Sequence, residues 1–215
     1  MNKRLKVLFD QEYIGRRYDN SYQLQAKFAT YFLLPKGIAV LKEQSSDVKY
    51  QVLRNLRNDA HVSERFIRHS INVFSVYACL RAAYINRFQF YTKSHMNGKE
   101  DYPEPLPDAH LCFQNVPGME HTKFLLEFVD GTRPHRIWRQ RISRLIEYID
   151  AGEWPESDIS PALLFVCETP ALEKRVRRWA YQAYEDALAE DVFVATATVD
   201  TVAQAVLHAK SPEAL

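Results

Sequence analysis

Three acidic residues in the second half of the chain have the types and positions that could bind a divalent metal. A Pro-Asp pair places Asp108 at the start of an apolar segment, and Glu127 lies inside the apolar segment 123–129, with Asp130 directly after it. Carboxylates bind Mg²⁺, and bound magnesium can activate water and polarise a phosphodiester. We therefore take Asp108, Glu127 and Asp130 as candidate catalytic residues, and Asp108 and Glu127 as candidate magnesium ligands.

One group that this chemistry needs is missing from the sequence. In the PD-(D/E)xK nuclease pattern, a lysine two residues after the second acid helps to position the attacking water, and that place is Val129 here. Losing one well-placed electrostatic group commonly costs about 100-fold to 1000-fold in rate. Lys123 or a nearby arginine is the candidate replacement, but Lys123 lies roughly 13 Å from Glu127 at about 3.3 Å per residue. We expect little or no cleavage.

The elements that must position these acids alternate between helix and strand. Apolar periodicity and turn residues predict helices over 66–84, 134–149 and from 170, strands over 87–92, 109–113, 124–129, 162–166 and 192–197, and a weak terminal helix. The order α-β-β-β-α-β-α-β indicates an α/β domain in which helices cover a mixed sheet. It is the core order of the restriction-endonuclease-like fold, which would bring Asp108 and Glu127 onto adjacent strands.

The N-terminal segment shows a different pattern. Apolar residues at helical spacing predict an amphipathic basic helix over 4–13, followed by two strands around 14–17 and 29–34 and a helix from Ile38. This order resembles the latter part of a winged helix-turn-helix, with the recognition-like helix within a few residues of Met1, so the chain is expected to start late. We predict a winged-helix-like part at 1–45, a linker at 46–62 and a nuclease-like domain at 63–215.

Charge is distributed unevenly along the chain. Residues 1–99 carry 17 basic and 7 acidic residues, whereas residues 100–215 carry 11 basic and 20 acidic ones. A basic front half favours a polyanionic partner, although an uneven spread of solvated charge would give the same numbers. The candidate DNA-binding residues are Lys3, Arg4, Lys6, Arg16, Arg17 and Lys27, all suited to phosphate contacts.

Several other classes of protein are disfavoured by the sequence. It has no apolar run of about 18 residues and no signal-peptide core, which predicts a cytoplasmic protein without a membrane partner. Cys79, Cys112 and Cys167 occur singly, so buried thiols are expected rather than zinc ligands or disulfides. The histidines lack ligand spacing and are expected to have packing or surface roles: His69, His110, His121 and His135.

Several segments together resemble a known family, the replication-relaxation proteins of bacterial mobile elements. They are residues 4–41, Arg68-His69-Ser70-Ile71-Asn72-Val73, Glu104-Pro105-Leu106-Pro107-Asp108-Ala109, Phe124-Leu125-Leu126-Glu127-Phe128-Val129-Asp130-Gly131-Thr132, and the helix ending Leu145-Ile146-Glu147-Tyr148. The resemblance implies an N-terminal winged helix joined to a nuclease-like domain, and a role in plasmid replication or DNA mobilisation.

The chain departs from the family pattern at the candidate site. The family strand commonly reads Glu-x-Asp, then one residue and Gly-Thr, so the second acid of the pattern falls on Val129, while Asp130 stands one place late. A shift of one residue along a strand turns a side chain to the opposite face of the sheet. Asp130 would then regain the metal-facing position only at a bulge or at the end of the strand.

These observations favour a DNA-binding protein of a plasmid or other mobile element with a degenerate nuclease-like domain. Two alternatives remain open. One is a magnesium-dependent DNA endonuclease that uses Asp108, Glu127 and Asp130. The other is a protein-interaction module of a nucleoprotein assembly, in which the acidic second half binds a protein partner or a second copy of the chain.

Overall fold

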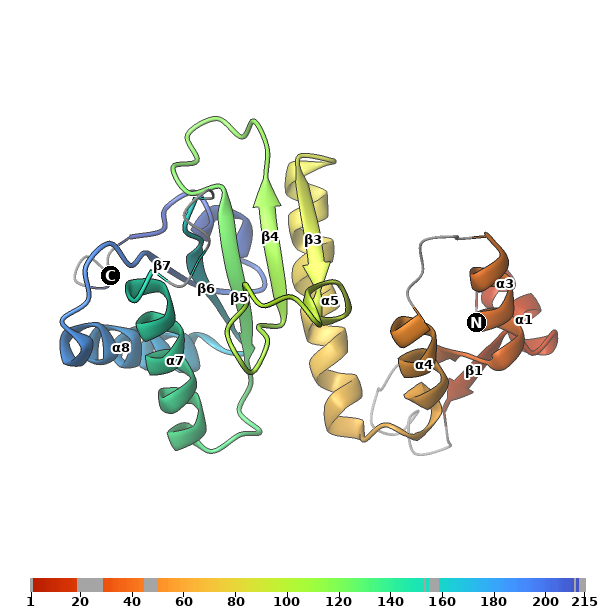
Figure 1. The fold of residues 1–215 in the computed structure, drawn as a ribbon. Coiled ribbons are helices and arrows are strands. Elements are labelled where there is room, and N and C mark those ends of the chain that lie inside the picture. Colours follow the sequence, from red (N-terminus) through yellow and green to blue (C-terminus); the bar gives the residue numbers. More distant parts are fainter. Residues whose placement is uncertain are drawn as a thin grey trace. The chain divides into compact units, whose positions relative to one another are not determined.

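A computed structural model describes residues 2–18, 29–44, 50–152, 154, 159–210 and 212. The chain divides into two compact units, residues 1–66 and 67–215. Figure 1 shows the order of the elements along the chain. No helix among the described residues is long and apolar enough to cross a membrane.

The first unit contains a two-stranded sheet with short helices. Helix α1 (Lys3–Asp10) leads to β1 (Ile14–Arg17), which pairs antiparallel with β2 (Thr30–Leu33). Helix α3 (Pro35–Gln44) begins at its proline, earlier than the predicted start at Ile38, because the fixed φ of proline suits the first turn of a helix. These elements confirm the predicted order of the N-terminal segment.

The range that was predicted to be a linker, residues 46–62, contains regular structure where it is described. It forms α4 (Tyr50–Asn58) and the short 3₁₀ helix η1 (Asp59–His61). Leu53 of α4 is buried, with Leu56 partly buried one turn later, so this helix has an apolar face that packs within the first unit. Both elements are in the first unit, and the boundary between the units falls within the next helix.

The second unit is an α/β domain with a five-stranded mixed sheet. Helix α5 (Glu64–Tyr84) leads into it, and the sheet order follows the chain: β3 (Phe88–Thr92), β4 (Ala109–Phe113), β5 (Lys123–Val129), β6 (Ala162–Cys167) and β7 (Val194–Thr198). The pairs β3–β4 and β4–β5 are antiparallel, whereas β5–β6 and β6–β7 are parallel. The predicted order α-β-β-β-α-β-α-β is confirmed, except that the short helix α6 (Lys93–Met96) is inserted between β3 and β4.

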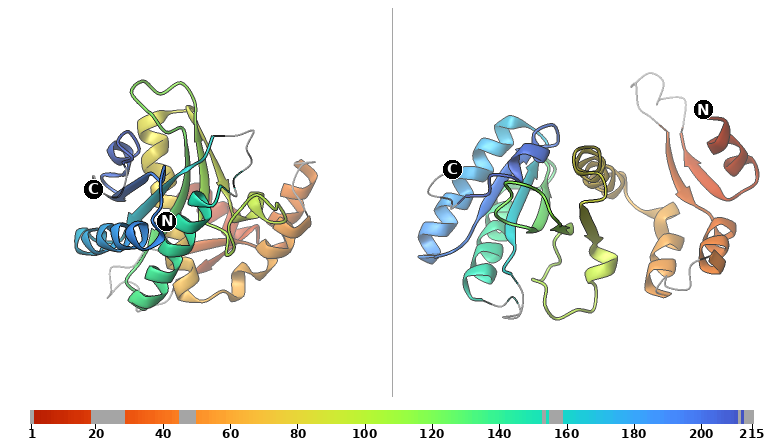
Figure 2. Two further views of the ribbon diagram at one scale, coloured as in Figure 1. Left: turned by 60° about the vertical axis from the view of Figure 1, so that its left-hand side comes forward. Right: turned by 90° about the horizontal axis from the view of Figure 1, so that it is seen from above.

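Helices cover both faces of this sheet. Helices α7 (His135–Asp150) and α8 (Pro170–Ala187) cover one face and lie side by side (Figures 1 and 2). Helix α5, with the short α9 (Val202–Ala205), packs on the other face. Alternate residues of β5 serve the two cores, because successive strand side chains point to opposite faces: Leu125 and Val129 pack under α7 and α8, and Phe124, Leu126 and Phe128 pack under α5.

Candidate functional site

Asp108 lies directly before β4, beside the longer strand β5. Its backbone N–H donates to the carbonyl oxygen of Leu126 at 2.9 Å, although Leu126 pairs with Ala109 in the strand register. Its carboxylate oxygen Oδ2 accepts a hydrogen bond from the backbone N–H of Phe128 at 2.8 Å. Asp108 is only 6% exposed. The end of β4 therefore holds this carboxylate against the backbone of β5.

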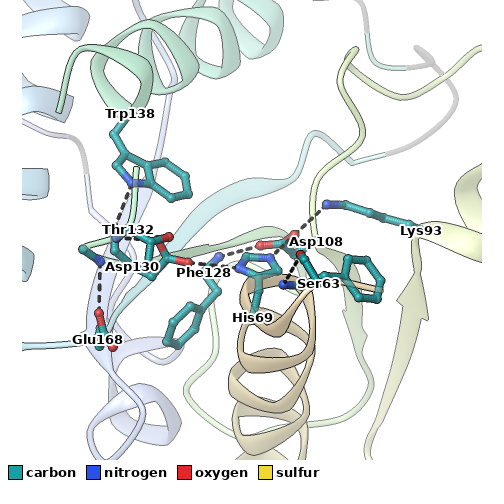
Figure 3. Close-up of polar contacts among 11 residues, drawn as sticks. Ser63, His69, Lys93, Asp108, Phe128, Asp130, Thr132, Trp138 and Glu168 are labelled. Carbon is teal, nitrogen blue, oxygen red and sulfur yellow. Dashed lines mark hydrogen bonds and ion pairs between the residues drawn. The ribbon is translucent and has the colours of Figure 1, made fainter. Parts of the chain in front are cut away.

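The side chains of His69 and Lys93 contact the other oxygen of this carboxylate (Figure 3). His69 of α5 places Nε2 2.9 Å from Asp108 Oδ1, and Lys93 places Nζ 2.7 Å from the same atom. Lys93 begins the short helix α6 (Lys93–Met96), which directly follows β3. Both oxygens of Asp108 are thus occupied by donors from three different elements.

Asp130 approaches the same histidine from its other side. It directly follows the last residue of β5, and its Oδ2 lies 3.5 Å from His69 Nδ1. Its Oδ1 accepts from the backbone N–H of Thr132 at 3.0 Å, and Trp138 Nε1 donates to its carbonyl oxygen at 3.0 Å. The one-residue shift seen in the sequence is therefore accommodated at the strand end, where Asp130 turns toward α5 (Figure 3).

The ionisation of this cluster follows from its hydrogen bonds and charges. The hydrogen bond to Asp108 raises the pKa of His69 above its usual value, against the opposing effect of burial. Burial would raise the pKa of Asp108, but the hydrogen bond from His69 and the charge of Lys93 lower it to about 2. The two carboxylates thus stabilise the imidazolium form of His69, in which both ring nitrogens donate toward them.

Glu127 belongs to the opposite face of the sheet. Arg141 of α7 donates to Glu127 Oε1 from Nε at 2.8 Å and also from Nη2, and both side chains are buried. Burial, together with the charge of Asp108, raises the pKa of Glu127, while Arg141 opposes the shift. Arg141 Nη1 is buried without a hydrogen-bond partner among the described residues. The carboxylate predicted to share a metal with Asp108 thus forms an internal ion pair with a helix.

The three candidate acids do not form a preorganised metal-binding site. Asp108 and Asp130 contact opposite edges of one imidazole ring, so the ring separates them, whereas magnesium needs its oxygens about 2.1 Å from one centre. Within the described ranges, no group of three or more His, Cys, Asp and Glu residues could hold a metal ion. Asp108 and Asp130 are therefore brought together by His69, whereas Glu127 is paired with Arg141, although the charge of Asp108 still acts on it.

The cation at the centre is not the one that the sequence suggested. Lys123 stands at the far end of β5, where its charge acts on His110 and Cys112, and Val129 is buried under α7 and α8. Lys93 reaches Asp108 instead. The register of the β3–β4 hairpin explains this, because Thr92 pairs with Ala109 and the next position of each strand end is Lys93 and Asp108.

His69 and Lys93 were both missed as site residues. His69 was assigned a packing or surface role because no second histidine stands at ligand spacing, and its position opposite two acids depends on the packing of α5 against β4 and β5. Lys93 was missed because its position beside Asp108 depends on the register of β3 against β4. The long connection between these strands, which includes α6, does not reveal that register in the sequence.

The candidate DNA-binding residues of the first unit have different surroundings. Lys3, Arg4 and Lys6 are exposed on α1. Arg16 places its guanidinium over the rings of Phe9 and Tyr18, at 5.2 and 5.1 Å from their centroids. Lys27 lies outside the described residues.

Arg17, another candidate DNA-binding residue, has an internal role. Its guanidinium donates to the carbonyl oxygens of Ala60 at 2.7 Å, Val62 at 2.9 Å and Asp59 at 3.1 Å, and it lies 3.6 Å from Glu64. These contacts tie β1 to η1 and the residue that follows it. Arg17 is therefore a structural residue of the first unit.

As predicted, His110 has a packing role and His135 a surface role, but of the three cysteines expected to be buried only Cys167 is. His110 is buried, and its Nδ1 forms a hydrogen bond with the Tyr102 hydroxyl at 2.8 Å. Burial lowers the pKa of His110 to about 4. Cys79, Cys112 and Cys167 are free thiols, the first two half-buried and the third buried.

Comparison of the chain with protein-family models, with curated proteins and with solved structures yields no match.

Proposed function

We propose that the chain is a cytoplasmic DNA-binding protein of a plasmid or other mobile element, acting in replication or mobilisation, with a nuclease-like domain whose centre is degenerate. DNA is the partner, and cleavage is not the activity. The proposal joins the resemblance to replication-relaxation proteins with the contacts of Asp108, Glu127 and Asp130. Each part of it has a separate structural support.

The second unit supports the restriction-endonuclease-like assignment through its topology. Helix α5 is followed by three antiparallel strands, a helix, and a fourth strand that runs parallel to the third. In the PD-(D/E)xK arrangement the first acid enters the second strand and the next acid lies on the third. Asp108 and Glu127 have these positions, at the start of β4 and within β5.

The first unit supports a winged-helix-like assignment through the sequence of α1, β1, β2 and α3. Its helix α1 presents exposed Lys3, Arg4 and Lys6, which suit contacts to phosphates. DNA binding by the first unit is then expected to fall steeply as salt rises, by about 0.9 logarithmic units per neutralised phosphate for each tenfold rise in salt.

The assignment of a degenerate nuclease centre depends on one observation: both carboxylate oxygens of Asp108 already accept hydrogen bonds from the chain. Lys93 and His69 donate to one of its oxygens and the backbone of Phe128 to the other. A magnesium ion would have to displace charged hydrogen bonds, which are about twice as strong as neutral ones. Glu127 would also have to leave Arg141, and a buried arginine without its carboxylate is costly.

A magnesium-dependent endonuclease is the second candidate, and Lys93 is the observation that favours it. The amine of Lys93 lies 2.7 Å from Asp108, the first acid, where it could position a water molecule. In the nuclease pattern a lysine has this role, and this chain has Val129 in its place. In this reading Asp130 joins Asp108 at the centre once metal and DNA rearrange His69. The two candidates differ in whether the purified chain cuts DNA.

The test measures binding and cleavage by the full chain and by two variants of similar shape, Asp108→Asn and Glu127→Gln. Binding of a labelled duplex is measured by fluorescence anisotropy, and cleavage of supercoiled plasmid is followed with Mg²⁺ or Mn²⁺. We expect affinities within about threefold of the unmodified chain for both variants and no metal-dependent cutting, because phosphate contacts dominate the affinity.

Metal-dependent cutting that both variants abolish would establish the endonuclease instead, with Lys93→Met as the next variant to assay. An unmodified chain that binds no duplex at low salt would contradict the DNA-binding proposal. It would leave the protein-interaction module as the remaining reading.

A further inference from the structure

The charges on helix α7 are ordered along its axis. Arg136 and Arg139 are exposed in its first half, and its last turns carry Glu147 and Asp150, also exposed. Its first turn has no acidic residue and its last turn no basic one. The N-terminal half of α7 is therefore cationic at the surface, and its C-terminal end is anionic.

Helix α8 repeats this order. Lys174, Arg175 and Arg178 are exposed in its first half, and Glu185 and Asp186 are exposed near its end. The acidic residue of its first turn, Glu173, accepts from Arg177 at 2.9 Å, so that charge is compensated within the helix. The last turn of α8 also lacks a basic residue.

This order opposes what helix stability favours. The N-terminus of a helix carries a partial positive charge and its C-terminus a partial negative charge, so acids stabilise the first turn and bases the last. Of these cations only Arg136 stands in a first turn, where it opposes the dipole of α7, and those of α8 follow its first turn. The cations of the two adjacent helices also repel one another, and an anionic partner at that end would offset the repulsion.

Contacts between the two helices hold these cations in one surface. Arg139 of α7 lies over the ring of Trp179 of α8, 5.7 Å from its centroid, and Arg175 of α8 donates to His135 Nε2 of α7 at 3.2 Å. We call the five residues Arg136, Arg139, Lys174, Arg175 and Arg178 the basic ridge. No carboxylate in the described part of the chain forms an ion pair with any of them.

The basic ridge adjoins the cluster around His69. Helix α7 follows β5 and helix α8 follows β6, so both begin at the edge where these parallel strands end (Figures 1 and 2). Asp130 stands at that edge, and Trp138 of α7 donates to its backbone carbonyl. A polymer that ran along the first halves of α7 and α8 would therefore pass beside Asp130.

We propose that the basic ridge binds the phosphate backbone of double-stranded DNA, so that the second unit has a DNA contact surface of its own. This rests on the proposed DNA-binding function and adds a surface to it. Four of the five cations are arginines, which bind phosphate through paired N–H donors. Trp138 and Trp179 are only 1% and 5% exposed, so they offer no faces for unstacked bases, and the surface fits a duplex better than a single strand.

The test compares three triple variants of the full chain. The first changes the ridge (Arg136→Gln, Arg175→Gln and Arg178→Gln), the second changes α1 (Lys3→Gln, Arg4→Gln and Lys6→Gln), and the third is a control that changes exposed cations elsewhere in the second unit (Arg81→Gln, Arg87→Gln and Lys99→Gln). Affinity for a labelled duplex of random sequence is measured as a function of salt, and the melting temperature is measured for each variant.

The ridge variant should make the log-log salt slope shallower by about 2 to 3, because each lost phosphate contact removes about 0.9. The control should keep the slope of the unmodified chain. The melting temperature of the ridge variant should stay close to that of the control variant, since all three changed side chains are exposed. A melting temperature below that of the control variant would assign these arginines to structure and overturn the proposal.

The outcomes separate the two proposals. If the α1 variant weakens binding while the ridge variant retains the full slope, the ridge proposal fails and DNA binding by the protein stands. If only the ridge variant weakens binding, the ridge proposal is supported and the first unit is removed from the interface. If the unmodified chain binds no duplex at all, both proposals fail.

Discussion

Lys93 and Asp108 occupy facing positions at the end of the β3–β4 hairpin, and their side chains meet at 2.7 Å. The pairing of Thr92 with Ala109 fixes this relationship, because the next residue outward on each segment is Lys93 or Asp108. The hairpin register thus delivers a cation to an acid that the sequence separates by 15 residues. His69 completes the arrangement from α5.

Replacing Lys93 should change the ionisation of its neighbours more than the stability of the fold. The charge of Lys93 lowers the pKa values of both His69 and Asp108. In Lys93→Met both pKa values should therefore rise, which NMR titration of the His69 ring and the Asp108 carboxyl would measure. The Lys93 side chain is 51% exposed, so we expect a loss of stability of no more than about 1 kcal/mol. An unchanged His69 pKa would show that Lys93 points elsewhere in solution.

His69 should make stability depend on pH in a defined window. Its folded pKa is raised above the usual value, so its stabilising contribution is complete below about pH 6.5 and is lost as pH rises through the folded pKa. The melting temperature of the unmodified chain should exceed that of His69→Gln at about pH 5 to 6, and the difference should shrink by about pH 8 to 9. A difference that grows with pH would contradict an imidazolium at this position.

Asp108 should act in the opposite direction at acid pH. Its folded pKa is lowered to about 2, so its contribution is present above about pH 4 and is lost as pH falls through the folded value. Asp108→Asn should remove this part of the acid destabilisation. Thermal unfolding of the unmodified chain and the variant between about pH 2 and 5 would measure it, and parallel curves over that range would count against the assignment.

The buried pair of Glu127 and Arg141 should show strong non-additivity. Removing one partner strands the other charge in the core, so Glu127→Leu or Arg141→Met alone should cost about 3 to 5 kcal/mol of unfolding free energy. The double variant should cost less than either single variant, because no unpaired charge remains. Urea unfolding of the unmodified chain, the two single variants and the double variant measures the four free energies of this double-mutant cycle. Additive losses would mean that the two side chains do not interact.

Replacing Arg17 should lower the stability of the first unit, whereas replacing Arg16 should not. Arg17 donates to three backbone carbonyls, so Arg17→Gln should destabilise the first unit by about 1 to 3 kcal/mol. Arg16→Gln, which leaves those carbonyls satisfied, serves as the matched variant. Hydrogen exchange over residues 59–62 should accelerate in Arg17→Gln alone. Equal acceleration in both variants would refute a specific role for Arg17.

Local patterns in the sequence determined most of the elements. In α7 the apolar residues Trp138, Ile142, Leu145 and Ile149 recur at helical spacing, and all four are buried under one face of the sheet. The strand over 109–113 has the predicted bounds, and α8 begins at the predicted Pro170. These predictions succeeded because burial on one face of an element imposes a period that the sequence displays directly.

The tertiary structure alone decided which charged groups meet. The sequence by itself identified Asp108, Glu127 and Asp130 as acids within or beside predicted strands. Which of them share a partner depends on strand register and helix packing: His69 joins Asp108 to Asp130, and Arg141 takes Glu127 to the other face. Side chains on opposite faces of one strand are neighbours in sequence but are separated by the sheet. Local periodicity records the face of an element, and only the assembled sheet fixes which residues from distant elements come within hydrogen-bonding distance.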